Sequence, residues 1–240
     1  LNGPVSAEEP ELQFRKDVAC QLGNGFPYIK VKVGASFDTN IPAARAILTE
    51  FPESRFQAVF DANQGFSLVD ALRFARELAE CASPRLLWFE QPVHRDDWTS
   101  MERICREATV PILLDECIYD EADIARAAAI GAYGIKLKLF KNFGISETLA
   151  LARIAQSKGL VVVFGNGVAT DIGNLGEYLT LENADGLFTF PAECNGFVKL
   201  AAPVFPDLLG VDADGNITCR ADDGAVRRAL AKFNQGIPNQ

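Results

Sequence analysis

The sequence predicts an α/β protein whose single parallel sheet closes into a barrel of the (β/α)₈ type. Short runs of β-branched and aromatic residues alternate with Ala-, Leu- and Arg-rich segments of helical spacing, and successive runs lie 23 to 30 residues apart. This alternation is typical of right-handed βαβ units. The length of 240 residues also suits one such barrel, which takes roughly 250 residues. Since no linker-like stretch interrupts the chain, we expect residues 1–240 to form one domain.

The predicted strands are short apolar runs bounded by polar or turn-forming residues. The seven clearest are Tyr28–Val33 (YIKVKV), Phe56–Asp61 (FQAVFD), Leu86–Glu90 (LLWFE), Val110–Asp115 (VPILLD), Tyr133–Lys138 (YGIKLK), Leu160–Phe164 (LVVVF) and Gly186–Phe190 (GLFTF). Leu1–Val5 is a further candidate at the start of the chain and brings the number to eight.

The predicted helices are the amphipathic segments between these runs. They are Glu11–Leu22, Ile41–Phe51, Ser67–Cys81, Asp96–Glu107, Glu121–Ile130, Ile145–Lys158 and Ala169–Leu181. A doubly wound open sheet is the alternative arrangement of the same elements. It is disfavoured because no glycine-rich phosphate loop follows the first strand, and Gly165–Gly167 is too short for a dinucleotide fingerprint.

Charge and composition exclude several classes of partner. The chain has 23 Lys and Arg against 32 Asp and Glu, a net charge of −9, and no basic run that would bind nucleic acid or an anionic membrane. No apolar stretch approaches the roughly 18–20 residues of a membrane span, and the first residues have no signal-peptide layout. The six cysteines are scattered without a CxxC pair, which indicates reduced thiols. We expect a cytoplasmic protein.

Lysines lie on the inward face of two predicted strands. Residues of a strand alternate between its two faces. Lys30 and Lys32 therefore share one face of the first run, and Lys136 and Lys138 share one face of the fifth, opposite apolar residues that suit a helix-covered surface. An ammonium group is costly to bury without a partner. These lysines predict a polar site inside the barrel.

Three consecutive strands end in a carboxylate, at Asp61, Glu90 and Asp115. A lone carboxylate at a strand end is often a helix N-cap or a solvated loop residue, but the carboxyl ends of barrel strands converge on one rim. Three carboxylates brought together there would repel one another unless a cation neutralises them. An all-oxygen set suits a hard divalent ion such as Mg²⁺, with Lys32 and Lys138 on its two sides.

Five short motifs then occur in register: Lys30-Val-Lys32, Asp61-Ala-Asn63, Trp88-Phe-Glu90-Gln-Pro92, Asp115-Glu116, and Lys138-Leu-Phe-Lys141 running into Gly144. Their order and spacing resemble those of the enolase superfamily, in particular its muconate-lactonizing-enzyme-like branch. The likeness covers roughly residues 30–144 and continues less distinctly towards Phe197. It implies a TIM-like (β/α)₇β barrel, in agreement with the eight strands and seven helices predicted above.

The resemblance also implies roles for individual residues. Asp61, Glu90 and Asp115 would ligate Mg²⁺, with Mn²⁺ as the alternative ion, and Lys32 and Lys138 would be the acid and base groups on opposite faces of the substrate.

Four further residues would support these groups. Lys30 would lie beside Lys32 and lower its pKa, since a neighbouring positive charge disfavours the ammonium form. Asn63, Glu116 and Lys141 would be supporting neighbours. The only histidine, His94, follows Glu90 in a loop and is expected to be a surface or packing residue, so no His–Asp base is present.

Members of this superfamily abstract the proton α to a carboxylate and stabilise the enediolate intermediate on the metal, with a lysine base in many of them. The resemblance therefore implies a Mg²⁺-dependent isomerase or lyase acting on a small carboxylate substrate. Cycloisomerase, o-succinylbenzoate-synthase-like dehydratase and racemase or epimerase reactions all remain open.

The family carries an α+β capping domain before its barrel, whereas this chain begins at what looks like the first barrel strand. We expect the cap to be absent from this chain and to be supplied by another segment; a homo-oligomer is compatible with the sequence. Two alternatives remain. One is a catalytically inactive or truncated barrel that serves as a binding or structural module, and the other is an unrelated aldolase-type barrel.

Three further features are assigned no catalytic role. Val211–Thr218 (VDADGNIT) looks superficially like a calcium loop but lacks the closing Glu, so we predict a turn between two short strands. Asp171 and Glu193 follow the last two predicted strands and are assigned no role.

Overall fold

The computed structural model describes residues 16–20, 28–34, 37–50, 56–167, 169–200, 205, 208–212, 216–220 and 224. Six parallel strands form one sheet in the order of the sequence: β1 Tyr28–Lys32, β2 Gln57–Asp61, β3 Leu86–Glu90, β4 Ile112–Leu114, β5 Gly134–Leu137 and β6 Val161–Phe164. They alternate with α2 Phe37–Thr49, α3 Leu68–Glu80, α4 Trp98–Glu107, α5 Glu121–Ala129, α6 Ile145–Ser157 and α7 Asp171–Glu182. Residues 16–20 are helical, inside the predicted helix Glu11–Leu22.

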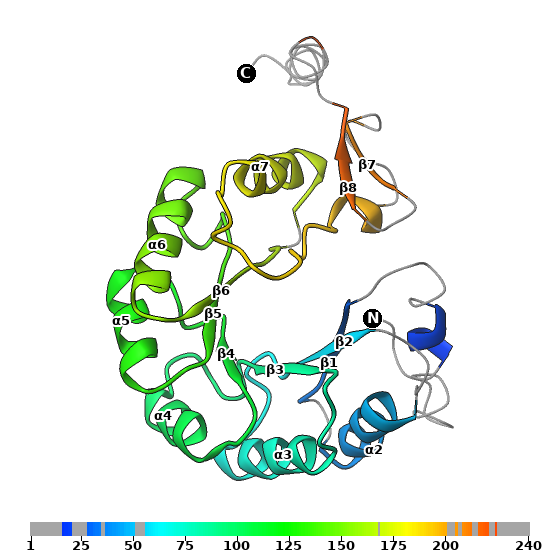
Figure 1. Ribbon diagram of the computed structural model, residues 1–240, viewed down its shortest axis with the longest axis vertical. Coiled ribbons are helices and arrows are strands. Elements are labelled where there is room, and N and C mark those ends of the chain that lie inside the picture. Colours follow the sequence, from blue (N-terminus) through cyan, green and yellow to red (C-terminus); the bar gives the residue numbers. More distant parts are fainter. Residues whose placement is uncertain are drawn as a thin grey trace, which may run out of the picture.

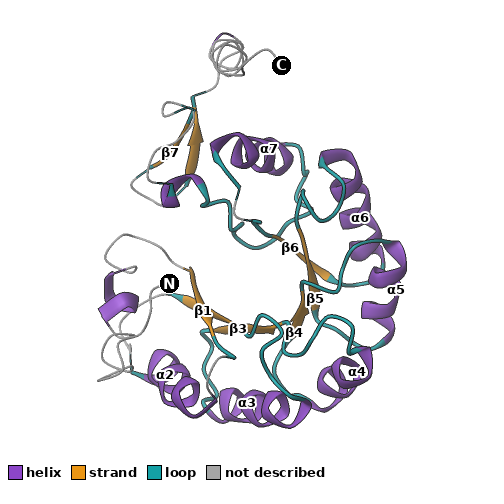
Figure 2. Cartoon of the chain, turned by 180° about the vertical axis from the view of Figure 1, so that it is seen from behind, coloured by secondary structure: helices purple, strands orange, loops and turns teal. Residues whose placement is uncertain are grey.

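The sheet is curved, and the helices lie along its outer side (Figure 1). The view from behind shows the same row of helices around the same arc of strands (Figure 2). A doubly wound sheet would reverse its strand order at a switch point and carry helices on both faces. The sequential order and the one-sided helices therefore exclude that alternative, and the described residues form a six-stranded part of a parallel barrel.

The main core fills the space between the sheet and the helices. The outward residues of β1 and β2 belong to it, among them Ile29, Val31 and Phe60, which are at most 3% exposed. Phe74 of α3 packs 5.2 Å from Phe89 of β3 between ring centroids. Burying each such side chain stabilises the fold by about 1.5–3 kcal/mol. The helices therefore cover the face of the sheet on which the sequence places the apolar residues.

A second, smaller apolar cluster lies on the inner side of the sheet. It consists of Val59, Trp88, Leu113 and Val163, with Leu87, Val161 and Phe190 packed against it. Val59, Trp88 and Leu113 have the same parity as the strand-end carboxylates Asp61, Glu90 and Asp115. The inner face therefore carries apolar residues lower in the barrel and charged residues at its rim.

Polar caps define where three helices begin. The Ser67 hydroxyl accepts the Asp70 N–H at 3.2 Å before α3, and Asp97 accepts the Ser100 N–H at 3.0 Å before α4. Asp120 starts α5 with a capping box. Each cap satisfies an N–H group that the first helical turn leaves unpaired.

Two predicted elements differ from the structure. The segment Gly186–Phe190 is not a strand: instead of joining the ladder beside β6, it packs through its side chains, with Phe188 5.0 Å from Phe164 and Phe190 5.0 Å from Trp88 between ring centroids. Helix α2 begins four residues before the predicted Ile41 and contains Pro42. The predicted strand Leu1–Val5 lies outside the described residues.

After α7 the chain forms a short 3₁₀ helix, η1 Phe197–Lys199, and an antiparallel pair, β7 Leu209–Val211 and β8 Ile217–Cys219. The pair agrees with the two short strands predicted around Val211–Thr218, of which residues 213–215 lie outside the described residues, and it lies beside α7 (Figure 1). Within the part of the chain that the structure describes, no helix is long and apolar enough to cross a membrane.

Candidate active site

The carboxyl ends of neighbouring strands bring the three predicted carboxylates to one rim. Asp61 and Glu90 are the last residues of β2 and β3, and Asp115 directly follows β4. The ladder pairs Lys32 with Asp61 and Asp61 with Glu90, so these side chains lie at the same level. All three carboxylates are at most 1% exposed. Buried carboxylates require partners, and lysines supply them.

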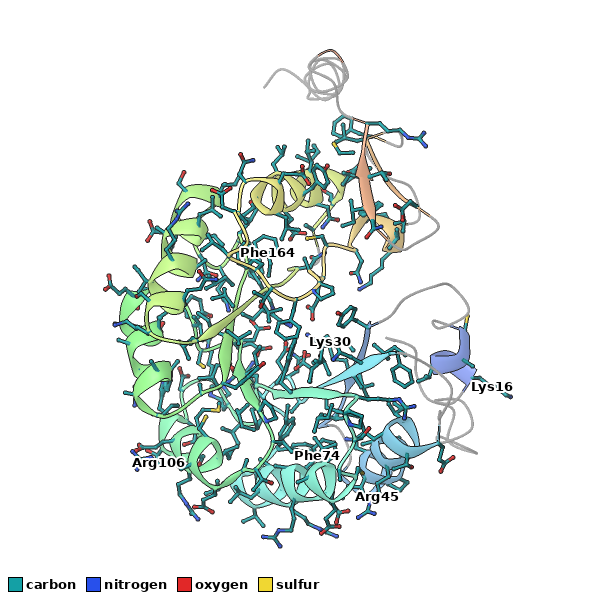
Figure 3. The ribbon with its side chains drawn as sticks, in the orientation of Figure 1. Lys16, Lys30, Arg45, Phe74, Arg106 and Phe164 are labelled. Atoms are coloured by element: carbon teal, nitrogen blue, oxygen red, sulfur yellow. The ribbon has the colours of Figure 1, made fainter. Side chains whose placement is uncertain are left out.

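Lys30 lies between two of the carboxylates. Its Nζ is 2.7 Å from Asp61 Oδ2, 2.7 Å from Glu90 Oε1 and 2.9 Å from Glu193 Oε1. Figure 3 shows Lys30 on the inner side of the sheet, whereas Phe74 of α3 lies on the opposite side, between the sheet and the helix. Lys30 therefore lies on the inward face of β1, as the alternation of faces predicted, and contacts the carboxylates there.

Lys136 is a fully buried lysine of this network. Its Nζ lies 2.7 Å from both carboxylate oxygens of Glu90 and 2.7 Å from Glu193 Oε1, and its side chain is 0% exposed. Its inward orientation agrees with the parity of β5, but its role as a central partner does not follow from any motif. Trp88 completes the surroundings of Glu90, since its indole N–H donates to Oε2 at 3.2 Å.

Asp115 is held by two other lysines. Lys138 Nζ lies 2.5 Å from Asp115 Oδ2, and Lys141 Nζ lies 2.9 Å from Asp115 Oδ1. Lys141 also donates to the backbone carbonyl of Lys136 at 3.0 Å. Lys141 thus connects the loop after β5 to the end of β4.

Lys32 is the more accessible lysine, with 39% of its side chain exposed and its Nζ 2.6 Å from Asp61 Oδ2. It also donates to Asn63 Oδ1, and the Asn63 amide donates to Glu116 Oε1. Glu116 Oε2 is buried without a hydrogen-bond partner among the described residues. Burial and the nearby Asp115 and Asp61 raise the pKa of Glu116. The predicted supporting residues Asn63 and Glu116 therefore belong to the same site.

The described residues contain no group of three His, Cys, Asp or Glu side chains placed to share one metal ion. The lysines are the reason. Lys30 lies between Asp61 and Glu90, and Lys138 and Lys141 both contact Asp115. The chemistry of the three carboxylates nevertheless fits a metal ion. Burial and the neighbouring Glu90 raise the pKa of Asp61 although Lys30 and Lys32 act in the opposite direction, the response of a crowded carboxylate whose burial and negative neighbour outweigh the positive charge beside it. A hard divalent ion supplies such charge, and carboxylate oxygens suit it.

Burial lowers the pKa of Lys141 despite the neighbouring Asp115, whereas two other lysines of the site shift in the opposite direction. Burial alone would lower the pKa of Lys30, but Glu90, Glu193 and Asp61 outweigh it and raise the pKa well above its ordinary value. The pKa of Lys138 is likewise raised, because Asp115 outweighs the effect of burial. An opposite charge at contact distance stabilises the ammonium form more than a neighbouring lysine destabilises it.

Sequence reasoning left out three residues that build this site. Glu193 was assigned no role, yet its carboxylate forms ion pairs with Lys30 and Lys136. Gln91 Oε1 accepts the Asp115 N–H at 2.8 Å, and Asn142 Oδ1 accepts the Lys138 N–H at 2.8 Å. Gln91 and Asn142 are both 0% exposed. The sequence could have indicated Gln91 and Asn142, because each directly follows a predicted site residue.

The glycines after β6 leave room for the lysine side chains. A Cβ placed on Gly165 would lie 2.6 Å from Lys136 Cδ and 2.9 Å from Lys138 Cε. Real Cβ atoms do not approach carbon this closely, so a side chain at position 165 would displace both lysines. The Gly165–Gly167 segment, too short for a dinucleotide fingerprint, thus forms part of the wall beside Lys138.

Two other polar residues lie apart from the network. Asp171 is buried at the start of α7, where it accepts the N–H groups of Ile172 and Phe205. His94 is exposed, with Nδ1 3.5 Å from Asp96 Oδ2, in agreement with the surface position predicted for it.

Comparison with known proteins gives a consistent result. A family model described as enolase C-terminal domain-like matches residues 13–178. A hydrophobic dipeptide epimerase from Citrifermentans bemidjiense is 31% identical over 185 residues, which cover 69% of this chain and 49% of that protein. The chain therefore spans about half the length of this curated relative.

Two solved structures share the fold. The dipeptide epimerase from Cytophaga hutchinsonii, complexed with Mg and the dipeptide D-Ala-L-Val, superposes with a TM-score of 0.76 and 25% identity, covering 90% of this chain and 57% of that one. The L-Ala-D/L-Glu epimerase from Bacillus subtilis gives a TM-score of 0.78 at 24% identity, covering 90% of this chain and 59% of that one. At the latter identity the likeness concerns the fold alone.

Proposed function

Because the chain belongs to the enolase C-terminal domain-like family, we propose that it forms the catalytic barrel of a racemase or epimerase acting on the carbon next to a substrate carboxylate. The substrate class we propose is the dipeptide. Family members also include cycloisomerases, but the relatives named above are dipeptide epimerases, which favours inversion at one carbon. Because the chain spans about half of its curated relative, the activity is proposed for this barrel rather than carried over from that protein.

One observation carries this proposal. Lys32 comes from β1 and Lys138 follows β5, and the carboxylates between them come from β2, β3 and β4. Two lysines thus enter from opposite sides of one carboxylate cluster. Inversion requires this arrangement, since one group removes a proton from one face of a carbon while another delivers a proton to the opposite face.

Asp61, Glu90 and Asp115 would hold Mg²⁺, with Mn²⁺ as the alternative. When bound, the ion would supply Lewis-acid stabilisation of the negative charge that develops on the substrate carboxylate. The crowding of Asp61 by Glu90, and the neutralisation of all three carboxylates by lysines, support a site built for positive charge.

The two lysines would perform the proton transfers at Nζ. Asp115 raises the pKa of Lys138 in this arrangement, so Lys138 can accept a proton only once that ion pair is loosened. Lys32 is less buried than Lys138 and would return a proton to the other face. Lys141 and Asn142 would position Lys138 through the loop that they anchor.

The test is exchange of the substrate α-proton for deuterium, followed by proton NMR on both epimers of a dipeptide. Lys138→Ala is expected to abolish epimerisation, because inversion needs an acid and a base on opposite faces, and to stop exchange of at least one epimer. Lys158→Ala, at the exposed end of α6, is the matched control and should behave as the wild type. Exchange of both epimers at the wild-type rate in Lys138→Ala would overturn the proposal.

A further inference from the structure

The loop between β5 and α6 exposes two aromatic side chains beside the site. Phe140 is 69% exposed and Phe143 is 78% exposed. Phe140 is only two residues from Lys138, whose Nζ contacts Asp115. A single exposed aromatic residue needs no explanation, but one fixed next to a reactive group can contact whatever that group binds.

The loop around Phe140 is held in place. Lys141 is 6% exposed and donates to the Lys136 carbonyl and to Asp115. Asn142 accepts the Lys138 N–H at 2.8 Å and donates to the Tyr119 carbonyl at 2.9 Å. Leu139, just before Phe140, faces Gly176 of α7. Both neighbours of Phe140 are therefore anchored, and only the aromatic side chain between them projects outward.

The Phe140 ring and the Lys138 side chain lie against one short segment. A Cβ on Gly165 would meet Lys138 Cε at 2.9 Å, and a Cβ on Gly167 would overlap the Phe140 ring. Positions 165 and 167 are two residues apart, which is about 7 Å at most in extended chain. The ring and the Lys138 side chain therefore lie against the same wall of the site.

We propose that Phe140 determines the specificity of this site by contacting the side chain of the residue that is epimerised, and that it selects dipeptides in which this residue is apolar. The proposal rests on the function proposed above. Lys138 would reach the hydrogen on the α-carbon, so the substituent on that carbon lies near the groups around Lys138. Phe140 offers hydrocarbon and no hydrogen-bond donor, so it favours an apolar substituent over an acidic one.

The experiment compares α-proton exchange of L-Ala-L-Leu with that of L-Ala-L-Glu in D₂O, using kcat/KM for each. The wild type is expected to prefer the Leu dipeptide. Phe140→Ala should lower the Leu-to-Glu ratio by about 10-fold, in the range expected for losing an apolar pocket contact, chiefly through slower reaction of the Leu dipeptide. Gly167→Ala should shift the ratio in the same direction, because its Cβ must displace the ring.

Phe143→Ala is the control, since it removes a more exposed aromatic residue from the same loop and should leave the ratio unchanged. An unchanged ratio in Phe140→Ala overturns this inference and leaves the proposed function intact. An equal slowing of both dipeptides also overturns it, because Phe140 would then act on the loop or on a covering segment rather than on the substrate side chain. Absence of exchange with any dipeptide in the wild type overturns the proposed function and this inference together.

Discussion

The Nζ of Lys136 lies 2.7 Å from each carboxylate oxygen of Glu90, and both side chains are inaccessible to solvent. The two residues come from β5 and β3, which are not neighbours in the sheet, so their contact crosses the inner side of the curved sheet. Burial alone would raise the pKa of Glu90, but Lys136 and Lys30 outweigh it and hold the pKa at about 2. The Glu90 carboxylate is therefore ionised at neutral pH.

Lys136→Met should destabilise the fold by about 3–5 kcal/mol, the usual effect of removing one partner from a buried ion pair. The midpoint of urea unfolding should fall while the dependence on urea stays constant. The control is Arg103→Met, which breaks the exposed i,i+4 pair with Glu107 and should cost less than about 0.5 kcal/mol. Equal effects in the two variants would contradict a buried ionic network.

The stability of the protein should fall in acid partly through Glu193. Burial would raise the pKa of this carboxyl, but Lys136 and Lys30 outweigh it and lower the pKa well below the ordinary 4.5. A group with a lowered folded-state pKa contributes stability above its unfolded pKa and loses that contribution as the pH falls towards the folded value. The loss should therefore begin near pH 4.5 and grow below it.

Glu193→Gln removes this titrating group. Between pH 7 and pH 3, the unfolding free energy of the variant should therefore fall by about 1–2 kcal/mol less than that of the wild type. Urea unfolding at each pH measures the difference. Glu102→Gln, which alters an exposed partner of Arg106, should keep the wild-type slope. A wild-type slope in Glu193→Gln would show that this carboxyl is not held by the buried lysines.

Mg²⁺ should raise the thermal unfolding midpoint, because an ion that binds only the folded chain stabilises it by about 2.7 kcal/mol at 100 times its Kd. Asp115→Asn should remove the response, whereas Asp96→Asn, in an exposed loop, should keep it. Calorimetric titration with Mg²⁺ provides an independent measurement. No response in the wild type would favour the alternative in which the barrel is a binding or structural module without a metal.

Much of the fold could be predicted because each strand carries its own signal. The predicted strand Leu86–Glu90 has the same bounds as β3, and the other five strands of the parallel sheet differ from prediction by at most two residues at either end. The strand predicted at Gly186–Phe190 was wrong because its apolar residues are covered by side-chain packing and not by pairing in the sheet. Phe188 and Phe190 pack on Phe164 and Trp88 through their rings, and periodicity cannot distinguish such packing from a ladder.

Much of the candidate site could also be predicted, because the parity of a strand decides which face a side chain takes. Lys30, Lys32, Lys136 and Lys138 all point inward, and Asp61, Glu90 and Asp115 share one rim. The partners within the site could not be predicted. Glu193 follows the segment that was wrongly predicted as a strand, and only the path of the chain after α7 brings it to Lys30 and Lys136.

The sequence by itself determined the alternation of strands and helices, the inward lysines and the three strand-end carboxylates, because these depend on local periodicity. Only the tertiary structure decided which lysine pairs with which carboxylate, that Lys136 and Glu193 join the network, and that the pKa values of Lys30 and Lys138 are raised whereas that of Lys141 is lowered. The reason is physical: electrostatic energies depend on distances and burial between residues far apart in the chain, and neither quantity is encoded in a local pattern.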